Sequence, residues 1–161
     1  TGTLYVARDA AHKRMMEVLD EGKELPFNIQ DQTIFYVGPT PSKPGQVFGS
    51  GGPTTSGRMD AYSPRLIKLG LHAMIGKGYR SDAVKKAIVD YHGVYFGAIG
   101  GAGAMMSSCI EECEVIAFDD LGPEAIRKLK VKNMPLVVVI DHLGNDLYEI
   151  GRKNYLKKDC K

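Results

Sequence analysis

Three short apolar runs, each ending in glycine, most constrain how this chain can fold. They are TIFYVG at 33–38, HAMIGKG at 72–78 and GVYFGAIGG at 93–101, and their β-branched and aromatic residues are typical of buried strands. Segments with a helical pattern separate these runs. Strands that alternate with helices predict an α/β fold.

The helices can be placed from apolar spacing and from capping residues. Asp9 is the expected N-cap of the first helix, Gly22 its expected end, and Ser81 the N-cap of a later helix. The expected helices cover 9–21, 58–70, 82–91, 102–114 and 122–131.

The remaining segments predict further strands and two irregular regions. We expect a strand over 115–120 and a closing hairpin over 134–151 with its turn from His142 to Asp146, so the sheet is mixed rather than purely parallel. Residues 39–57 form a long loop, and the basic tail is expected to fray.

Size and charge bound the class of protein. A chain of 161 residues suits a single domain over 1–161 with its own core. The net charge of +2 gives no argument for nucleic acid or an anionic membrane as a partner, and no apolar run approaches the roughly 18 residues of a membrane span. The start, TGTLYVARDAAHKR, does not resemble a signal peptide, and the cysteine usage makes the cytoplasm the expected compartment.

The three cysteines do not suggest a disulfide framework or an iron–sulfur ligand set. Their number is odd, and their spacing is not that of a cluster motif. Cys109 and Cys113 would share one face of the helix expected over 102–114, either as a metal pair or, as we favour, as small buried side chains. The third, Cys160, lies in the tail.

The stretch GGPTTSGRMD, at 51–60, has the composition of an anion site. Its glycines allow a ligand close to the backbone, and Thr54 and Thr55 offer hydroxyl and N–H groups before a helix start that favours anions. Arg58 adds a planar fork that matches a carboxylate. A capped helix with a surface arginine explains the same residues equally well.

Two more cations lie at comparable junctions. Arg8 precedes the first helix, and Lys77 lies between two glycines at the end of an expected strand, where α/β folds place ligands. If Arg8, Arg58 and Lys77 converge, a small dicarboxylate fits them. GAIGGAG, at 97–103, lacks the spacing of a dinucleotide loop, and we interpret it as close strand-to-helix packing.

These motifs, in this order, resemble class I fumarate hydratases, which are iron–sulfur hydro-lyases. The resemblance rests on TGTLYVARDAAHKR, IFYVGPT, GGPTTSGRMD, MIGKG, YFGAIGGAGA, and AFDDLGPEAI with MPLVVVID, and it covers nearly the whole chain. The chain is similar to the β-type part, either the β subunit of two-chain enzymes or the C-terminal domain of one-chain enzymes. The resemblance implies a swivelling β/β/α domain, and the family domain usually has a further strand segment before TGT.

The implied activity is the reversible hydration of fumarate to L-malate, a step of the tricarboxylic acid cycle. A 4Fe-4S cluster acts as the Lewis acid, and its cysteines belong to an α-type partner rather than to this chain. The resemblance implies that Arg8, Arg58 and Lys77 bind substrate carboxylates and that Thr54 takes part in proton transfer. His12 and Thr55 have supporting roles, and αβ units are expected to associate.

Two alternatives stay open. The L(+)-tartrate dehydratases, which convert tartrate to oxaloacetate, have β subunits that share GPTTS and the glycine turn with lysine, but they differ around ARDAAHKR. The sequence favours a fumarase over this second hydro-lyase. A non-enzymatic anion-binding module is the rival from another class.

Overall fold

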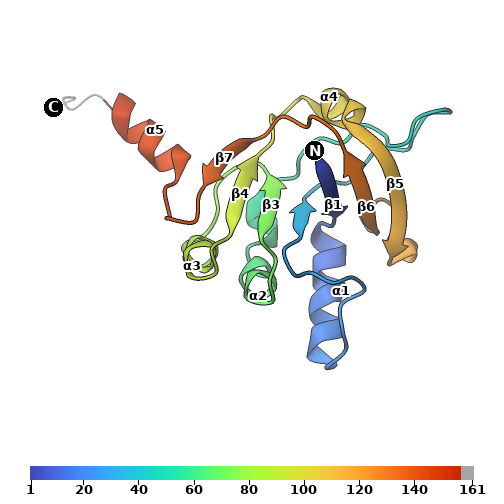
Figure 1. Cartoon of the computed structure of the whole chain (residues 1–161), viewed down its shortest axis with the longest axis horizontal. Coiled ribbons are helices and arrows are strands. Elements are labelled where there is room, and N and C mark those ends of the chain that lie inside the picture. Colours follow the sequence, from blue (N-terminus) through green and yellow to red (C-terminus); the bar gives the residue numbers. More distant parts are fainter. Residues whose placement is uncertain (157–161) are drawn as a thin grey trace.

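The computed structural model of the chain describes residues 1–156 and contains one seven-stranded sheet in the order β5-β6-β1-β2-β3-β4-β7 (Figure 1). Helices and strands are mixed along the chain, so the predicted α/β class is confirmed. The strands are β1 (Gly2–Val6), β2 (Thr33–Phe35), β3 (Ala73–Gly76), β4 (Val94–Gly97), β5 (Ile110–Ala117), β6 (Ile126–Val131) and β7 (Val137–Ile140).

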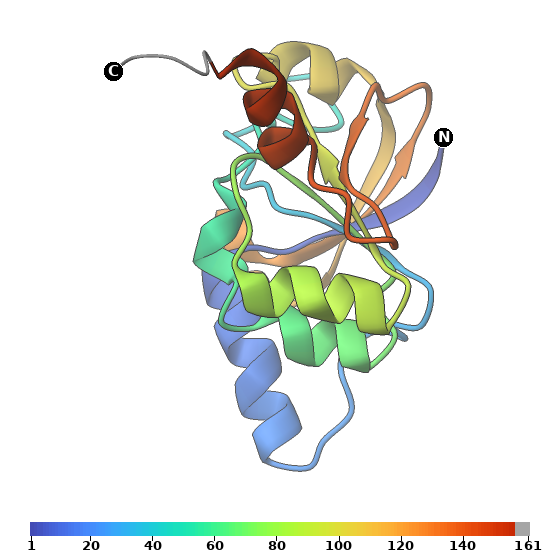
Figure 2. The ribbon, with the colours of Figure 1, turned by 90° about the vertical axis from the view of Figure 1, so that its left-hand side faces the viewer.

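The centre of the sheet is parallel and its flanks are antiparallel. β1, β2, β3 and β4 run in parallel, β6 pairs antiparallel with β1, β5 pairs antiparallel with β6, and β7 pairs antiparallel with β4. The prediction of a mixed sheet is therefore confirmed. Because the four central strands share one direction, their carboxyl ends meet at one edge, which lies at the left of Figure 2, where β1 leads into α1.

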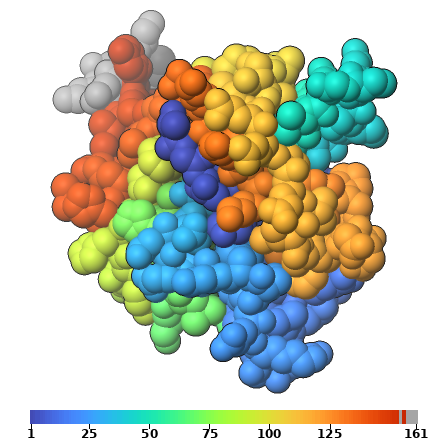
Figure 3. Space-filling model, turned by 45° about the vertical axis from the view of Figure 1, so that its right-hand side comes forward, coloured from blue at the N-terminus to red at the C-terminus, as the bar shows by residue number. Residues whose placement is uncertain are grey.

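Helices α1 (Asp9–Asp20), α2 (Ser63–Lys68) and α3 (Asp82–Asp90) lie together on one face of the sheet (Figure 2). Their apolar side chains, such as Met15, Leu66 and Ile88, form one core with Ile34 and Met74 of the strands. A second core on the other face includes Phe48 of the long loop and Met106 of α4 (Gly103–Ser108). Residues 40–47 of that loop are exposed and project from the molecule (Figure 3).

The first and third expected helices are confirmed within a residue or two. Gly22 follows the end of α1 with a φ of 71°, and the Ser81 side chain accepts a hydrogen bond from the Val84 N–H at the start of α3. The expected N-cap at Asp9 is wrong. Arg8 holds the cap position, and the carboxylate of Glu124 binds the Ala10 N–H from another part of the chain.

The helix expected over 58–70 is divided. The 3₁₀ turn η1 (Ser56–Met59) comes first, and α2 begins only at Ser63, with Pro64 in its first turn. Proline fits the first turn of a helix because the N–H it lacks would have no partner there.

The helix expected over 102–114 is correct only for its first half, and most of the helix expected over 122–131 is corrected to a strand. α4 ends at Ser108 and β5 follows, while η2 (Asp119–Glu124) leads into β6. In β6, Ile126, Leu129 and Val131 are buried while Lys128 and Lys130 are exposed. Across the ladder, Glu112 faces Lys130 and Glu114 faces Lys128, so each charged run has a complementary run beside it.

The prediction of a closing hairpin over 134–151 is also wrong. After β7 the chain turns at 141–146 and enters α5 (Leu147–Tyr155), where the Asp146 side chain accepts a hydrogen bond from the Tyr148 N–H. The last part of the basic tail, with Cys160, lies outside the described residues. Across 1–156, every helix is too short or too polar to cross a bilayer.

Candidate functional site at the carboxyl edge of the sheet

The segment from Pro53 to Ser56 is attached to the carboxyl ends of β2 and β3. The Thr54 N–H donates to the carbonyl of Tyr36, just beyond β2, at 2.7 Å. Thr55 forms a parallel bridge with Lys77, and the Ser56 N–H donates to the Lys77 carbonyl at 2.9 Å. Backbone hydrogen bonds thus hold both threonines and Lys77 beside one another.

The Ser56 side chain stabilises this arrangement through hydrogen bonds. The side chain is buried, and its Oγ accepts a hydrogen bond from the Lys77 N–H at 3.1 Å and lies 2.9 Å from the hydroxyl of Tyr95. Burial raises the pKa of Tyr95 to about 12, so this hydroxyl keeps its proton and can donate. Gly76 leaves the space for Ser56, because a Cβ at position 76 would lie 1.9 Å from Oγ.

The start of α1 brings two arginines to the same edge. The Arg58 guanidinium binds Asp9 with two hydrogen bonds, from Nε to Oδ1 at 3.0 Å and from Nη2 to Oδ2 at 2.5 Å. The neighbouring Arg8 donates from Nη2 to Glu124 at 2.8 Å. The Arg8 guanidinium lies against Gly38, where an added Cβ would be 2.7 Å from Cζ.

Lys77 differs from these arginines because, among residues 1–156, it has no ion pair. Its side chain is partly exposed at the end of β3. Bridges link Val37 to Pro53 and Thr55 to Lys77, and the Arg58 N–H donates to the Thr55 carbonyl at 3.4 Å, so Lys77, the threonines and Arg58 are connected through the backbone. All three cations predicted from the sequence lie at this edge, together with Thr54, which is buried, and Thr55, which is exposed.

His12 lies directly beneath Arg8 and is buried. Its Nδ1 is 2.9 Å from the carbonyl oxygen of Arg8, which can only accept, so Nδ1 carries the proton. Its Nε2 is buried with no hydrogen-bond partner, as is the Nε of Arg8. Burial lowers the pKa of His12 from 6.5 to about 4, although the hydrogen bond to Arg8 opposes this shift. The ring is therefore neutral at pH 7.

The lowered pKa makes the stability of the fold depend on pH. Between pH 6.5 and about 4 the unfolded chain binds the proton that folded His12 excludes, so stability falls as the pH drops through this window. Each pH unit there costs about 1.4 kcal/mol, and lowering the pH from 6.5 to 5 should cost about 2 kcal/mol. Urea denaturation at several pH values would measure this. His12→Asn should reduce the slope of the unfolding free energy against pH by the amount that corresponds to about one bound proton. An unchanged slope would contradict the assignment to His12.

Arg80 is a buried arginine that packs behind this edge of the sheet, and it was not predicted from the sequence. The side chain of Arg80 has no exposed surface, and its guanidinium lies over the rings of Tyr36 and Tyr95, with centroids at 5.4 and 5.0 Å. It donates to Asp60 at 2.7 Å and to Ser63 Oγ at 2.8 Å. Burial works to lower the pKa of Arg80, but Tyr36 and Asp60 outweigh it, so the guanidinium stays charged.

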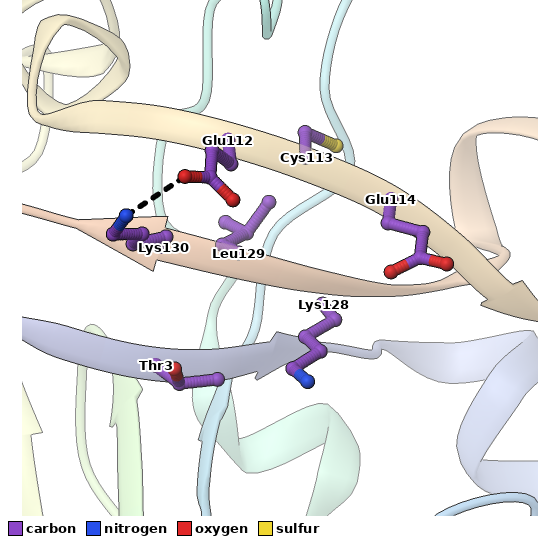
Figure 4. Close-up of a pocket in the computed structure, with 7 residues that line it drawn as sticks. All are labelled: Thr3, Glu112, Cys113, Glu114, Lys128, Leu129 and Lys130. Carbon is purple, nitrogen blue, oxygen red and sulfur yellow. Dashed lines mark hydrogen bonds and ion pairs between the residues drawn. The ribbon is translucent and has the colours of Figure 1, made fainter.

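Cys109 and Cys113 lie elsewhere, and the expectation that these two share a helix face is wrong. Cys109 caps α4, while Cys113 lies in β5, where burial raises the pKa of its thiol. Cys113 borders a hollow of about 340 Å³ on β5, β6 and β1, in which Glu112 is hydrogen-bonded to Lys130 (Figure 4). No group of three or more histidine, cysteine or acidic side chains suited to a metal occurs among the residues described.

The edge therefore combines cationic side chains and hydroxyl groups without a metal-ligand cluster of its own among residues 1–156. Such a surface can bind an anion that carries more than one negative charge and hold it in a fixed orientation. Neither Arg80 nor the two arginine-binding carboxylates, Asp9 and Glu124, carried a sequence signal that marked them as part of this surface.

Comparisons with known proteins show which family the sequence belongs to. The family described as Fumarase C-terminus matches residues 1–151. The anaerobic class I fumarate hydratase of Escherichia coli K12 is 42% identical over 151 residues, which are 92% of this chain and 28% of that protein. A mitochondrial fumarate hydratase 1 of Leishmania major matches to the same extent.

A relative of similar length is the putative L(+)-tartrate dehydratase subunit beta of Methanocaldococcus jannaschii. It is 38% identical over 163 residues, which are 97% of this chain and 84% of that protein. The chain thus spans less than a third of the fumarate hydratases but most of the separate β subunit. From its sequence, the chain belongs to the Fumarase C-terminus family.

Proposed function

We propose that this chain is the β-type part of a class I fumarate hydratase and hydrates fumarate to L-malate reversibly, together with an α-type partner. One observation carries the proposal: Arg8, Arg58 and Lys77 lie at one sheet edge with Thr54, in a chain of the Fumarase C-terminus family. Fumarate and malate each carry two carboxylates, and three cations match two such groups.

In this proposal the chain supplies binding and proton transfer. Arg8, Arg58 and Lys77 bind the carboxylates, and Thr54 moves a proton at the reacting carbon. A threonine hydroxyl is a weak base because its pKa is far above neutral, so it needs nearby cations to stabilise the alkoxide. Lys77 lies beside the threonines and has no carboxylate partner among residues 1–156, so its charge is not neutralised locally. Neutral His12 and the hydroxyl of Thr55 support the site.

The proposed cofactor is a 4Fe-4S cluster held by the α-type partner, where it would serve as a Lewis acid. The length of the Methanocaldococcus relative, named a subunit beta, supports a two-chain enzyme, whereas the longer fumarate hydratases suggest fusion of both parts. We further propose that αβ units associate and act in the cytoplasm, in the tricarboxylic acid cycle.

Tartrate dehydratase is the second candidate because the Methanocaldococcus relative bears that name at 38% identity. Tartrate is also a dicarboxylate, so the same cations would bind it. A site for tartrate would differ from a site for malate in the groups around the substrate hydroxyls.

The deciding experiment is anaerobic reconstitution of the chain with an α-type fumarase subunit and its iron–sulfur cluster, with fumarate, L-malate and L-tartrate assayed in parallel. Malate formation that requires both chains supports the proposal. Turnover of tartrate alone would keep the site and change the substrate. No turnover of any of the three with the cluster intact would leave an anion-binding module.

A further inference from the structure

Arg58 is held in place by only one of its two edges. A guanidinium presents two edges that can form paired hydrogen bonds, one with Nε and Nη2 and the other with Nη1 and Nη2. Asp9 takes the first edge with both of its carboxylate oxygens. The second edge has no hydrogen-bond partner among residues 1–156, and the Arg58 side chain is 56% exposed. This edge can therefore receive a carboxylate from solution while the first stays bound.

Asp9 is itself well fixed. It is the first residue of α1, and both its neighbours are tied to Glu124: the Arg8 side chain binds Oε1 and the Ala10 N–H binds Oε2. Arg14 of the same helix binds Asp120, so two ion pairs connect α1 to η2. Arg58, in contrast, comes from a single 3₁₀ turn on a long side chain with several rotatable bonds. A carboxylate whose neighbours are held by ion pairs and hydrogen bonds thus restrains the long side chain of Arg58.

We infer that Asp9 is a positioning residue, which holds the Nε–Nη2 edge of Arg58 so that the Nη1–Nη2 edge faces a ligand carboxylate. This inference rests on the proposed function, because it assigns the ligand to Arg58. Orienting the guanidinium before binding removes part of the ordering cost that binding would otherwise carry. The competing possibility is that Asp9 occupies the ligand's place and must leave before binding.

The test compares four variants of the chain, each reconstituted with the α-type partner: Asp9→Asn, Arg58→Ala, both together, and Asp20→Asn. The last is the matched control, because Asp20 pairs with exposed Arg65 at 2.5 Å on the far end of α1. The probe is succinate, an unreactive dicarboxylate, whose dissociation constant is measured by titration, with kcat and KM for fumarate measured alongside. Thermal unfolding checks that each variant is folded.

We expect Asp9→Asn to weaken succinate binding about tenfold and to lower kcat/KM for fumarate by roughly 10- to 100-fold, while Asp20→Asn changes neither. In the Arg58→Ala background Asp9→Asn should add nothing further, since Asp9 acts only through Arg58. If Asp9→Asn fails to fold, Asp9→Glu takes its place, because the longer side chain keeps the charge and moves the guanidinium.

Three results would overturn the inference: tighter succinate binding by Asp9→Asn, an effect no larger than that of Asp20→Asn, or a loss that persists undiminished without Arg58. Full activity of Arg58→Ala is a different result, because it would refute the carboxylate clamp in the proposed function. An inactive Arg58→Ala beside a normal Asp9→Asn would refute only the role of Asp9.

Discussion

Arg80→Met is expected to lower the free energy of unfolding by about 3–5 kcal/mol. Arg80 is buried, and methionine fills similar space without charge, so the change leaves the carboxylate of Asp60, which is only 13% exposed, without its cation. Removing one partner of a buried pair is costly because the remaining charge stays desolvated. Chemical denaturation of the isolated chain and the variant would measure the difference.

Arg65→Met is the matched control for this change. Arg65 also pairs with an aspartate, Asp20, but the two side chains are 43% and 66% exposed. Water and salt screen such pairs, so the loss should stay within about 1 kcal/mol. A double change, Arg80→Met with Asp60→Leu, should recover much of the stability because no unpaired charge remains. A loss below about 1 kcal/mol for Arg80→Met alone would contradict the buried-pair argument.

Arg80 also shows why part of the site escapes sequence analysis. In the sequence it is an arginine before the Ser81 cap, a position typical of an exposed cation. Its burial depends on the rings of Tyr36 and Tyr95, which approach it only after β2 and β4 have joined the same sheet. Asp9 is similar, because its partner Arg58 is 49 residues away in the sequence. Contacts of this kind have no local signal.

The local signals succeeded where short-range chemistry decides the structure. Gly22 and Ser81 marked helix ends because positive φ and a side-chain cap involve only a few neighbouring residues. The three glycine-ended runs marked β2, β3 and β4 because buried parallel strands are continuously apolar. Among the site residues singled out from the sequence, Lys77 follows β3 and Arg8 lies just beyond β1, so the parallel topology brings these two to one edge of the sheet.

The same reasoning failed where two strands depend on each other. IRKLKV has a helical composition, and only pairing with the acidic run of β5 makes its lysines favourable in a strand. The final hairpin failed because Asp146 serves as a helix cap, a role that a turn residue and a cap residue share in sequence. In both cases tertiary contacts outweighed intrinsic propensity.

Thr54→Val is expected to lower kcat for fumarate hydration by about 10²- to 10⁴-fold in the reconstituted enzyme, with little change in KM. Valine has nearly the shape of threonine, and the Thr54 N–H that donates to Tyr36 is retained, so the buried segment should keep its place. What is lost is the hydroxyl that the proposal assigns to proton transfer. Steady-state kinetics at saturating fumarate would measure the change.

Thr55→Val is the matched control, because it distinguishes proton transfer by Thr54 from a general requirement for a hydroxyl group in this segment. Thr55 is the next residue in the same segment, is exposed, and bridges Lys77 through its backbone, so its loss should cost less than about tenfold. If Thr54→Val raised KM and left kcat unchanged, Thr54 would bind the substrate without moving a proton. The chain would then contribute only recognition, and both the acid and the base of the reaction would have to come from the α-type partner.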